Sequence, residues 1–196
     1  ITRTAANDNT AVVVEVNSET DFVAKNAVFQ EFVQSIADQA LASSLNGGKD
    51  GEDVEALLAE NGLKEALVEK TATIGEKLSF RRFEKVTGDV VTSYLHGGGR
   101  IGVLVKFDTT PEIAAKEEFK AYAKDICMQV AAANPGYLNE ASVPADVIEH
   151  ERKILTEQVI NEGKPAQIAE KIVNGKMGKY YKENCLVDQL FVKDGD

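Results

Sequence analysis

The feature that most constrains this chain is an internal repeat, because residues 11–42 align with residues 101–132 without a gap. Each copy consists of a short apolar run, a polar segment typical of a helix start, and a longer stretch with apolar residues three and four positions apart. That spacing places the apolar side chains on one face of a helix. The identical pairs are Val13 and Val103, Thr20 and Thr110, Ala24 and Ala114, Phe29 and Phe119, Ile36 and Ile126, Gln39 and Gln129, and Ala42 and Ala132. The sequence therefore predicts one strand–helix unit that occurs twice.

Each predicted helix has an apolar stripe and a polar start signal. The stripe of the first copy is Phe29, Phe32, Val33, Ile36 and Ala40, and that of the second copy is Phe119, Tyr122, Ala123, Ile126 and Val130. Ser and Thr side chains accept hydrogen bonds from the free backbone N–H groups of a helix start. Either Ser18 or Thr20 can cap the first copy, and either Thr109 or Thr110 the second.

The remaining segments set the fold class. Residues 77–86 predict a strand, and residues 89–95 and 100–107, with the glycine-rich HGGG between them, predict a β-hairpin. Arg81 and Arg82 are expected on opposite faces of the first of these strands. With the apolar run of the first copy, we expect a three-stranded antiparallel sheet of residues 11–16, 77–86 and 89–95, and helices on one of its faces. The second copy of the repeat would form a second sheet, and this sheet has no strand that corresponds to residues 77–86.

Two long helical runs follow the second copy, over residues 144–161 and 165–181, and NEGKP lies between them. Gly163 can end the first run and Pro165 can begin the second, which predicts an antiparallel helical hairpin. The predicted fold class is therefore α+β: two pseudo-symmetric subdomains, each an antiparallel sheet with helices on one face, plus a protruding helical hairpin.

The expected domain organisation follows from these elements. Residues 1–93 form the N-terminal core subdomain, residues 94–142 and 184–196 form the C-terminal core subdomain, and residues 143–183 form the inserted hairpin. Because the second copy lacks a strand and the chain begins with Ile rather than Met, we expect a fragment or processed form of a protein that continues beyond residue 196.

Composition argues against several classes of function. The net charge of −10 disfavours binding to a phosphate backbone, which requires clustered Lys and Arg. Cys127 and Cys185 form no CxxC pattern, which suggests a reducing compartment with incidental thiols. No segment approaches the roughly 18 consecutive apolar residues of a membrane span, and no signal peptide is evident. We therefore expect no nucleic-acid partner and no membrane association.

The motifs provide little support for an enzyme. HGGGR at residues 96–100 resembles a phosphate cradle or an oxyanion loop, but the chain has neither GK[ST] after it nor GxSxG anywhere. We favour a glycine-rich turn that needs positive φ values or a close backbone approach. His96 and His150 are the only histidines, and no HExxH or zinc-type spacing is present. We expect no catalytic residues, no metal and no cofactor.

One aromatic residue does not fit the core pattern. Phe22 follows Asp21 in the segment SETDFVAKN, and polar residues separate it from the apolar stripe of the next helix. Its ring could tuck against its own strand, which the pattern alone favours. The alternative is an exposed aromatic at a strand-to-helix junction that enters a pocket of a partner, where such a residue can contribute roughly 2–4 kcal/mol.

Five segments of the chain resemble the bacterial elongation factor Ts family, the nucleotide-exchange factors of the translation GTPase EF-Tu. They are VEVNSETDFVAKN at 14–26, ATIGEKLSFRRF at 72–83, YLHGGGRIGVLV at 94–105, MQVAAANPGYL at 128–138, and GKPAQIAEKIVNGKM at 163–177. They occur in the order of the family and cover essentially the whole chain. The resemblance implies a core of two subdomains with a helical hairpin, without the N-terminal helical domain and the C-terminal end that family members carry.

The resemblance also implies a function and its residues. Phe22 would enter an apolar pocket of EF-Tu near the magnesium side of its nucleotide site, with Asp21 beside it. Ile101 and Gly102 match contact positions in the second subdomain, and Gln129 occupies a contact position that holds His in well-known members. The implied activity is promotion of GDP release, without chemistry of its own, in the bacterial cytoplasm. The alternative location is an organelle. A homodimer through the core is also compatible with the resemblance.

Two alternatives make different structural predictions. A hydrolase that uses His96 would require a nucleophile within hydrogen-bond reach of its ring. A non-catalytic α+β dimerisation or interaction protein would bury Phe22 within its own chain.

Overall fold

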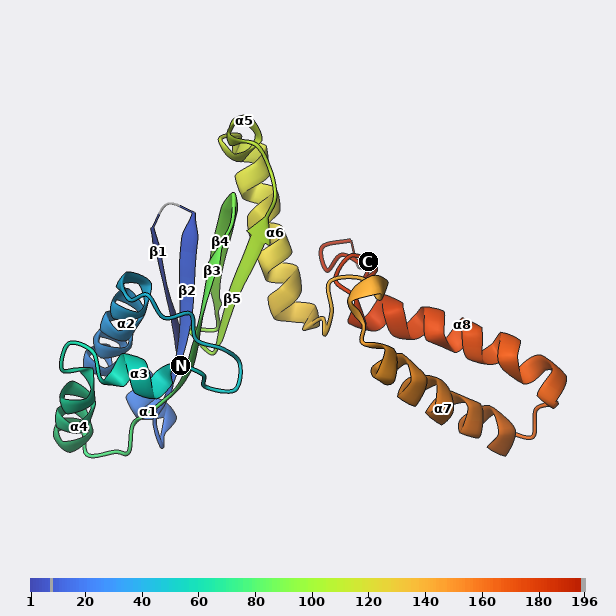
Figure 1. Cartoon of the computed structure of the whole chain (residues 1–196), viewed down its shortest axis with the longest axis horizontal. Helices are drawn as coiled ribbons and strands as arrows, with labels where there is room; N and C mark the ends of the chain where they lie inside the picture. Colours follow the sequence, from blue (N-terminus) through green and yellow to red (C-terminus); the bar gives the residue numbers. More distant parts are fainter. Residues whose placement is uncertain (8, 195–196) are drawn as a thin grey trace. The chain divides into compact units, whose positions relative to one another are not determined.

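The computed structural model describes residues 1–7 and 9–194, and of residue 166 only the backbone (Figure 1). Residues 8, 195 and 196, which belong to the expected ranges 1–93 and 184–196, lie outside the described residues. The strands are β1 (Thr2–Asn7), β2 (Thr10–Asn17), β3 (Ser79–Thr87), β4 (Val90–His96) and β5 (Ile101–Phe107). The helices are α1 (Asp21–Ala24), α2 (Ala27–Ala42), α3 (Val54–Leu58), α4 (Leu63–Ile74), α5 (Pro111–Ala114), α6 (Glu117–Ala133), the 3-10 helix η1 (Glu140–Ser142), α7 (Ala145–Asn161) and α8 (Ala166–Asn184). The α+β fold class is confirmed.

The element bounds reproduce the internal repeat. The series β2, α1, α2 recurs as β5, α5, α6, and the starts of α1 and α2 are each 90 residues before those of α5 and α6. Thr20 caps α1 through a hydrogen bond from the Val23 N–H (3.4 Å), and Thr110 caps α5 through one from the Ile113 N–H (3.4 Å). The sequence left two candidates for each cap, and the same Thr of the repeat is the cap in both copies.

The first sheet has the strand order β1–β2–β3, with antiparallel pairing throughout. The expectation that residues 89–95 supply its third strand was wrong, because β4 pairs with β5 in a separate two-stranded sheet. The third strand is β1, which has no apolar alternation of its own. It is completed by pairing with β2, for example Thr4 with Val13.

The first sheet lies between two layers within residues 1–131. Helix α2 covers one face, where its buried residues meet Val12, Val14 and Val16 of β2. The β4–β5 hairpin lies against the other face, and α6 lies beyond it (Figure 1). The main core is thus the interface between α2 and the first sheet. Its buried α2 residues are Phe29, Phe32, Val33, Ile36, Ala37 and Ala40.

The apolar stripe of the second copy is less completely covered than that of the first. Ala123 is buried, but Phe119 is only partly buried and Tyr122 is 56% exposed. The Phe119 ring meets Phe107 of β5 edge to face, with ring centroids 5.4 Å apart. The physical reason is that two strands offer α6 a narrower surface than the three strands and additional helices around α2.

A β-bulge in β3 overturns the expectation for the paired arginines. Glu15 of β2 pairs with Arg82, whereas the next residue, Val16, pairs with Phe80, so Arg81 is the extra residue. The bulge shifts the alternation of side chains by one position. Arg81 and Arg82 therefore both reach Glu15 instead of lying on opposite faces, and Phe80 and Phe83 both face the core.

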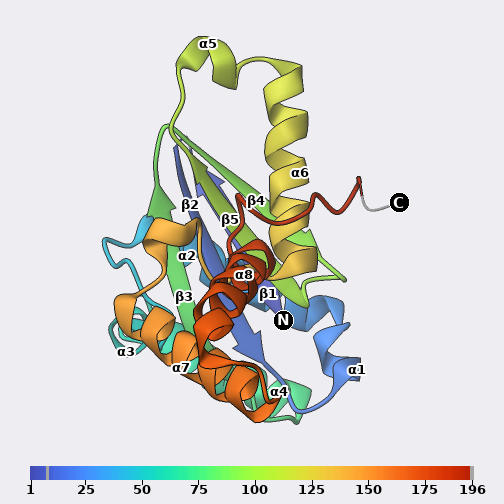
Figure 2. The same cartoon turned by 90° about the vertical axis from the view of Figure 1, so that its right-hand side faces the viewer.

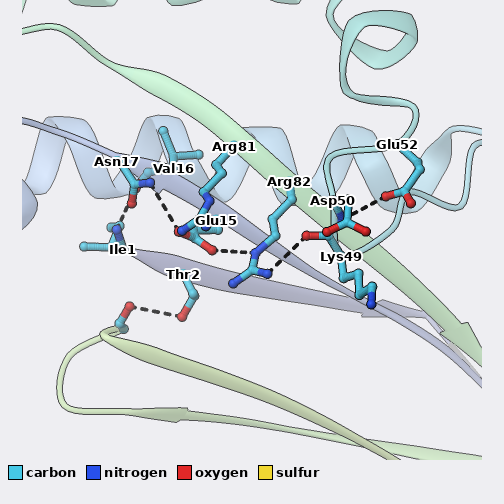
Figure 3. A network of polar contacts seen from close by, with 11 residues as sticks. Ile1, Thr2, Glu15, Val16, Asn17, Lys49, Asp50, Glu52, Arg81 and Arg82 are labelled. Carbon is cyan, nitrogen blue, oxygen red and sulfur yellow. Dashed lines mark hydrogen bonds and ion pairs between the residues drawn. The ribbon is translucent and has the colours of Figure 1, made fainter. Parts of the chain in front are cut away.

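Glu15 is the acceptor at the centre of this polar network (Figure 3). Its carboxylate accepts hydrogen bonds from Arg82 Nε (2.7 Å), Arg81 Nη1 (3.0 Å) and Asn17 Nδ2 (3.2 Å). Partial burial by itself would raise the pKa of Glu15, but the hydrogen bonds from Arg82, Asn17 and Arg81 outweigh it and leave that pKa below its usual value. The carboxylate is therefore more acidic in the folded than in the unfolded chain.

This shift predicts that Glu15 contributes stability above the unfolded pKa of about 4.3 and loses that contribution as the pH falls through the folded pKa. Urea unfolding of the parent chain and of Glu15→Gln should differ by about 1 kcal/mol at neutral pH, and the difference should shrink at acid pH. Glu69→Gln, on the exposed surface of α4, is the matched control and should show a small difference at every pH. A difference for Glu15→Gln that grows on acidification would contradict the prediction.

Residues 132–194 form the second unit, whose main feature is the expected helical hairpin of α7 and α8 (Figure 2). Gly163, at φ 71°, lies in the turn between the helices. The buried contact residues are Leu155, Val159, Ala169, Val173 and Met177. At the base of the hairpin, Asn184 O accepts hydrogen bonds from the N–H groups of Gly136 (2.9 Å) and Tyr137 (3.1 Å).

The two compact units, 1–131 and 132–196, differ from the expected division of the chain. The expected boundary between residues 93 and 94 falls inside β4, whose hydrogen-bond partner is β5. Because the β4–β5 hairpin also lies against the first sheet, both copies of the repeat belong to one unit. The helical hairpin, expected as an insert in the second subdomain, belongs to the other unit.

Both cysteines are buried free thiols. Burial raises the pKa of the Cys127 thiol to about 11, and burial also raises the pKa of Cys185. Within residues 1–7 and 9–194, no helix combines the length and the apolar character needed to cross a bilayer.

Candidate functional site

The candidate site is the junction between β2 and α2, where the short helix α1 carries Phe22. Thr20 caps α1, and Asn26 caps α2 by accepting hydrogen bonds from the N–H groups of Val28 (2.8 Å) and Phe29 (3.4 Å). The Gln30 side chain donates to Ala24 O at the end of α1 (3.0 Å). Thr20, Asn26 and Gln30, three polar residues near Phe22, are thus engaged in capping or in hydrogen bonds to the backbone.

Phe22 is 81% exposed, the most exposed of the large apolar side chains in the described chain. The expectation that its ring tucks against its own strand was therefore wrong. The following residue, Val23, packs against the core instead. The dimerisation alternative had predicted a buried Phe22, so that prediction is wrong as well.

Asp21 lies next to Phe22 and forms an ion pair with Lys25 one turn later (2.8 Å). The hydrogen bond from Lys25 and its positive charge lower the pKa of Asp21. A shallow depression beside α1 is lined by Asp21, Lys25 and Arg100, among others. Charged side chains therefore form a rim around this depression, beside the helix that carries Phe22.

The structure places Ile101 and Gly102 near this rim. Both residues line a second depression. Arg100 lines this depression and also the one beside Asp21. Ile101 is 41% exposed. The structure also explains why position 102 is a glycine, because a Cβ there would lie 2.8 Å from the Thr2 hydroxyl and from a Val13 methyl group. Sequence reasoning did not select Arg100.

Gln129 is the one predicted site residue that the structure places in the interior. It lies on α6 and is 3% exposed. It lines neither the depression beside Asp21 nor the one beside Ile101. The other four residues come from the two copies of the repeat, and three of them, Asp21, Ile101 and Gly102, line depressions that Arg100 also lines.

The HGGGR segment forms the turn between β4 and β5. Gly97, Gly98 and Gly99 all have positive φ, and a Cβ on Gly99 would lie 2.8 Å from Thr2 O. This close approach allows the Thr2 N–H to donate to Gly99 O (2.6 Å). The glycine-rich turn is thus confirmed as a feature of backbone geometry.

His96 does not support the hydrolase alternative. Its Nδ1 lies 3.0 Å from the Tyr94 hydroxyl on the exposed strand surface. In the described part of the chain, no Ser, Thr or Cys nucleophile is hydrogen-bonded to its ring. Among residues 1–7 and 9–194, no group of three or more His, Cys, Asp or Glu residues could hold a metal ion.

One residue that sequence reasoning missed is Glu76, in the loop between α4 and β3. Its carboxylate accepts hydrogen bonds from the N–H groups of Glu19 (3.1 Å) and Thr20 (2.9 Å) and from the Thr20 hydroxyl (2.5 Å). In return, the Glu19 carboxylate accepts from the Lys77 N–H (3.0 Å). The only available signal was the position of Glu76 in a segment that resembles the family.

The fold and this surface define an α+β protein of two repeated strand–helix units that presents an exposed aromatic residue at a capped junction. The family description that matches residues 19–196 is Elongation factor TS. Elongation factor Ts of Clostridioides difficile (strain 630) is 50% identical over an alignment of 196 positions, which covers 96% of this chain and 62% of that protein. The chain belongs to the elongation factor Ts family, whose members are translation elongation factors, and it spans about three fifths of the length of this relative.

Proposed function

We propose that this chain promotes the release of GDP from the translation GTPase EF-Tu in the bacterial cytoplasm. The observation that carries the proposal is the 81% exposure of Phe22 on a helix whose polar neighbours are all engaged in capping or ion pairing. A single exposed apolar residue is common on protein surfaces, but large aromatic side chains are among the residues that most often dominate a binding interface. Membership of the family supports EF-Tu as the partner.

The proposed mechanism is displacement of the ligands around Mg²⁺. A GTPase holds its nucleotide through backbone N–H groups and a Mg²⁺ ion that requires near-ideal octahedral geometry. Phe22 would insert into an apolar pocket near this ion, with Asp21 beside it. Burial of a Phe side chain provides roughly 1.5–3 kcal/mol, which is sufficient to support a small distortion of the site.

Thermodynamic linkage explains how insertion becomes exchange. A factor that binds better to the nucleotide-free GTPase must weaken nucleotide binding by the same factor, and the nucleotide must in turn expel it. Ile101 and Gly102, near Arg100, would extend the contact beyond Phe22. Gln129 has no direct role in this proposal, because its side chain is interior.

The test is stopped-flow release of a fluorescent GDP analogue from EF-Tu, with and without the chain. We expect release to accelerate with the concentration of the chain, and excess GDP to dissociate the chain from EF-Tu. The full-length Clostridioides difficile relative is the positive control. Acceleration by that relative but not by this chain, at any concentration, would contradict the proposal.

A further inference from the structure

We propose that Glu76 is a positioning residue for Phe22. By holding Glu19 and Thr20, it fixes the orientation of α1 and therefore the direction in which Phe22 leaves the surface. The consequence for nucleotide exchange rests on the proposed function. The hydrogen bonds that Glu76 accepts from Glu19 and Thr20 concern this chain alone, and their effect on α1 can be measured without a partner.

Helix α1 needs such a support because it is too short to hold itself. It has four residues, none of them buried. A single helical turn is unfavourable in isolation, since it fixes several backbone angles for few hydrogen bonds. Val23 is the one residue of α1 that packs against the main core, and it is only partly buried, so polar contacts at the start of α1 are needed to restrict the helix further.

Glu76 supplies these contacts at the start of α1. Its carboxylate binds two N–H groups and one hydroxyl, and hydrogen bonds to a charged acceptor are about twice as strong as neutral ones. The Thr20 hydroxyl donates to Glu76 and accepts from the Val23 N–H. Because Glu76 accepts the hydroxyl proton, the lone pairs of this oxygen can accept from the start of α1. Phe22 lies in this turn.

The contacts at the other end of α1 are local in sequence. Asn26 caps the next helix, and Gln30 donates to Ala24 O. The bonds to Glu76, by contrast, span 56 and 57 residues and tie the junction to the loop before β3. Because they reach a separate element, they restrict the rotation of α1 as a whole.

The second copy of the repeat provides an internal comparison. The Thr109 N–H, which corresponds to that of Glu19, donates to the Asp89 carboxylate (3.0 Å). This is one hydrogen bond where Glu76 accepts three. At the position of Phe22 the second copy has Glu112, a residue that water solvates readily. The more extensive support is thus found in the copy that carries the aromatic ring.

NMR-detected amide hydrogen exchange on Glu76→Gln tests whether Glu76 restricts the motion of α1. We expect the amides of Glu19, Thr20, Val23 and Ala24 to exchange about threefold to thirtyfold faster, with α2 unchanged. Asp89→Asn is the matched control, because Asp89 accepts from the Thr109 N–H, which corresponds to that of Glu19 in the first copy, and it should leave these amides unchanged. Unchanged rates in Glu76→Gln, or an equal acceleration throughout α2, would overturn the proposal.

The functional consequence is tested by GDP release in a double-mutant cycle of Glu76→Gln and Phe22→Ala. We expect Glu76→Gln to reduce the acceleration by about threefold to tenfold in the parent and not further in the Phe22→Ala background. Reductions that multiply would mean that Glu76 acts independently of Phe22 and would overturn its positioning role. If the parent chain itself does not accelerate release, the proposed function fails, while hydrogen exchange still decides whether Glu76 holds α1.

Discussion

Phe22→Ala is expected to reduce the acceleration of GDP release from EF-Tu by roughly 10- to 150-fold, without a loss of folding stability. The factor corresponds to the roughly 1.5–3 kcal/mol that burial of a Phe side chain provides when it enters a pocket. Because Phe22 is 81% exposed in the free chain, its removal takes away few intramolecular contacts. The free energy of unfolding should therefore remain within about 0.5 kcal/mol of the parent.

The measurement is the stopped-flow assay at a fixed concentration of chain, together with urea unfolding of each variant. Val68→Ala is the matched control, since Val68 is also a largely exposed apolar residue but lies on α4. It should change neither the exchange rate nor the stability appreciably. Equal exchange by the parent and by Phe22→Ala would show that the ring does not insert, even if the chain binds EF-Tu.

Phe29→Ala is expected to have the largest effect on stability, about 3–5 kcal/mol. Phe29 is fully buried between α2 and the first sheet, in the cluster that includes Val12, Val14 and Val16. Removal of its ring loses the favourable burial and leaves a cavity that the surrounding strands can fill only in part. The core of the first copy would therefore lose a large part of its stabilisation.

The repeat supplies the control for this prediction. Phe119 is the equivalent residue of the second copy, but it is only partly buried. We expect Phe119→Ala to cost less, about 1–2 kcal/mol, because part of its ring already contacts water. Urea unfolding monitored by circular dichroism measures both variants. Equal costs would contradict the view that α2 packs more completely than α6.

The sequence alone was sufficient for features that depend on local periodicity. Apolar residues at spacings of three and four predict α2, α6, α7 and α8, because such stripes must lie on one helix face. Glycine in the HGGG segment predicts the turn between β4 and β5, since only glycine readily adopts three successive positive φ values. The capping candidates were also local, although the structure was needed to select Thr20 and Thr110.

Features that depend on pairing partners were not predictable in the same way. The segment TRTAAN of β1 has no alternation of apolar residues, and it becomes a strand because β2 offers it free hydrogen-bonding groups. The bulge at Arg81 is a property of the β2–β3 register. Without it, a strict period of two wrongly places Arg81 and Arg82 on opposite faces and wrongly separates Phe80 from Phe83.

The candidate site shows the same division. The sequence by itself determined that Phe22 stands outside the apolar stripe of α2, and its resemblance to the family indicated a role. Whether the ring is exposed could be decided only by the tertiary structure, because exposure depends on which other elements approach it. Val23 turns to the core, Glu76 binds the junction from 56 residues away, and no other part of the described chain covers the Phe22 ring. Such long-range contacts leave no periodic signal in the sequence.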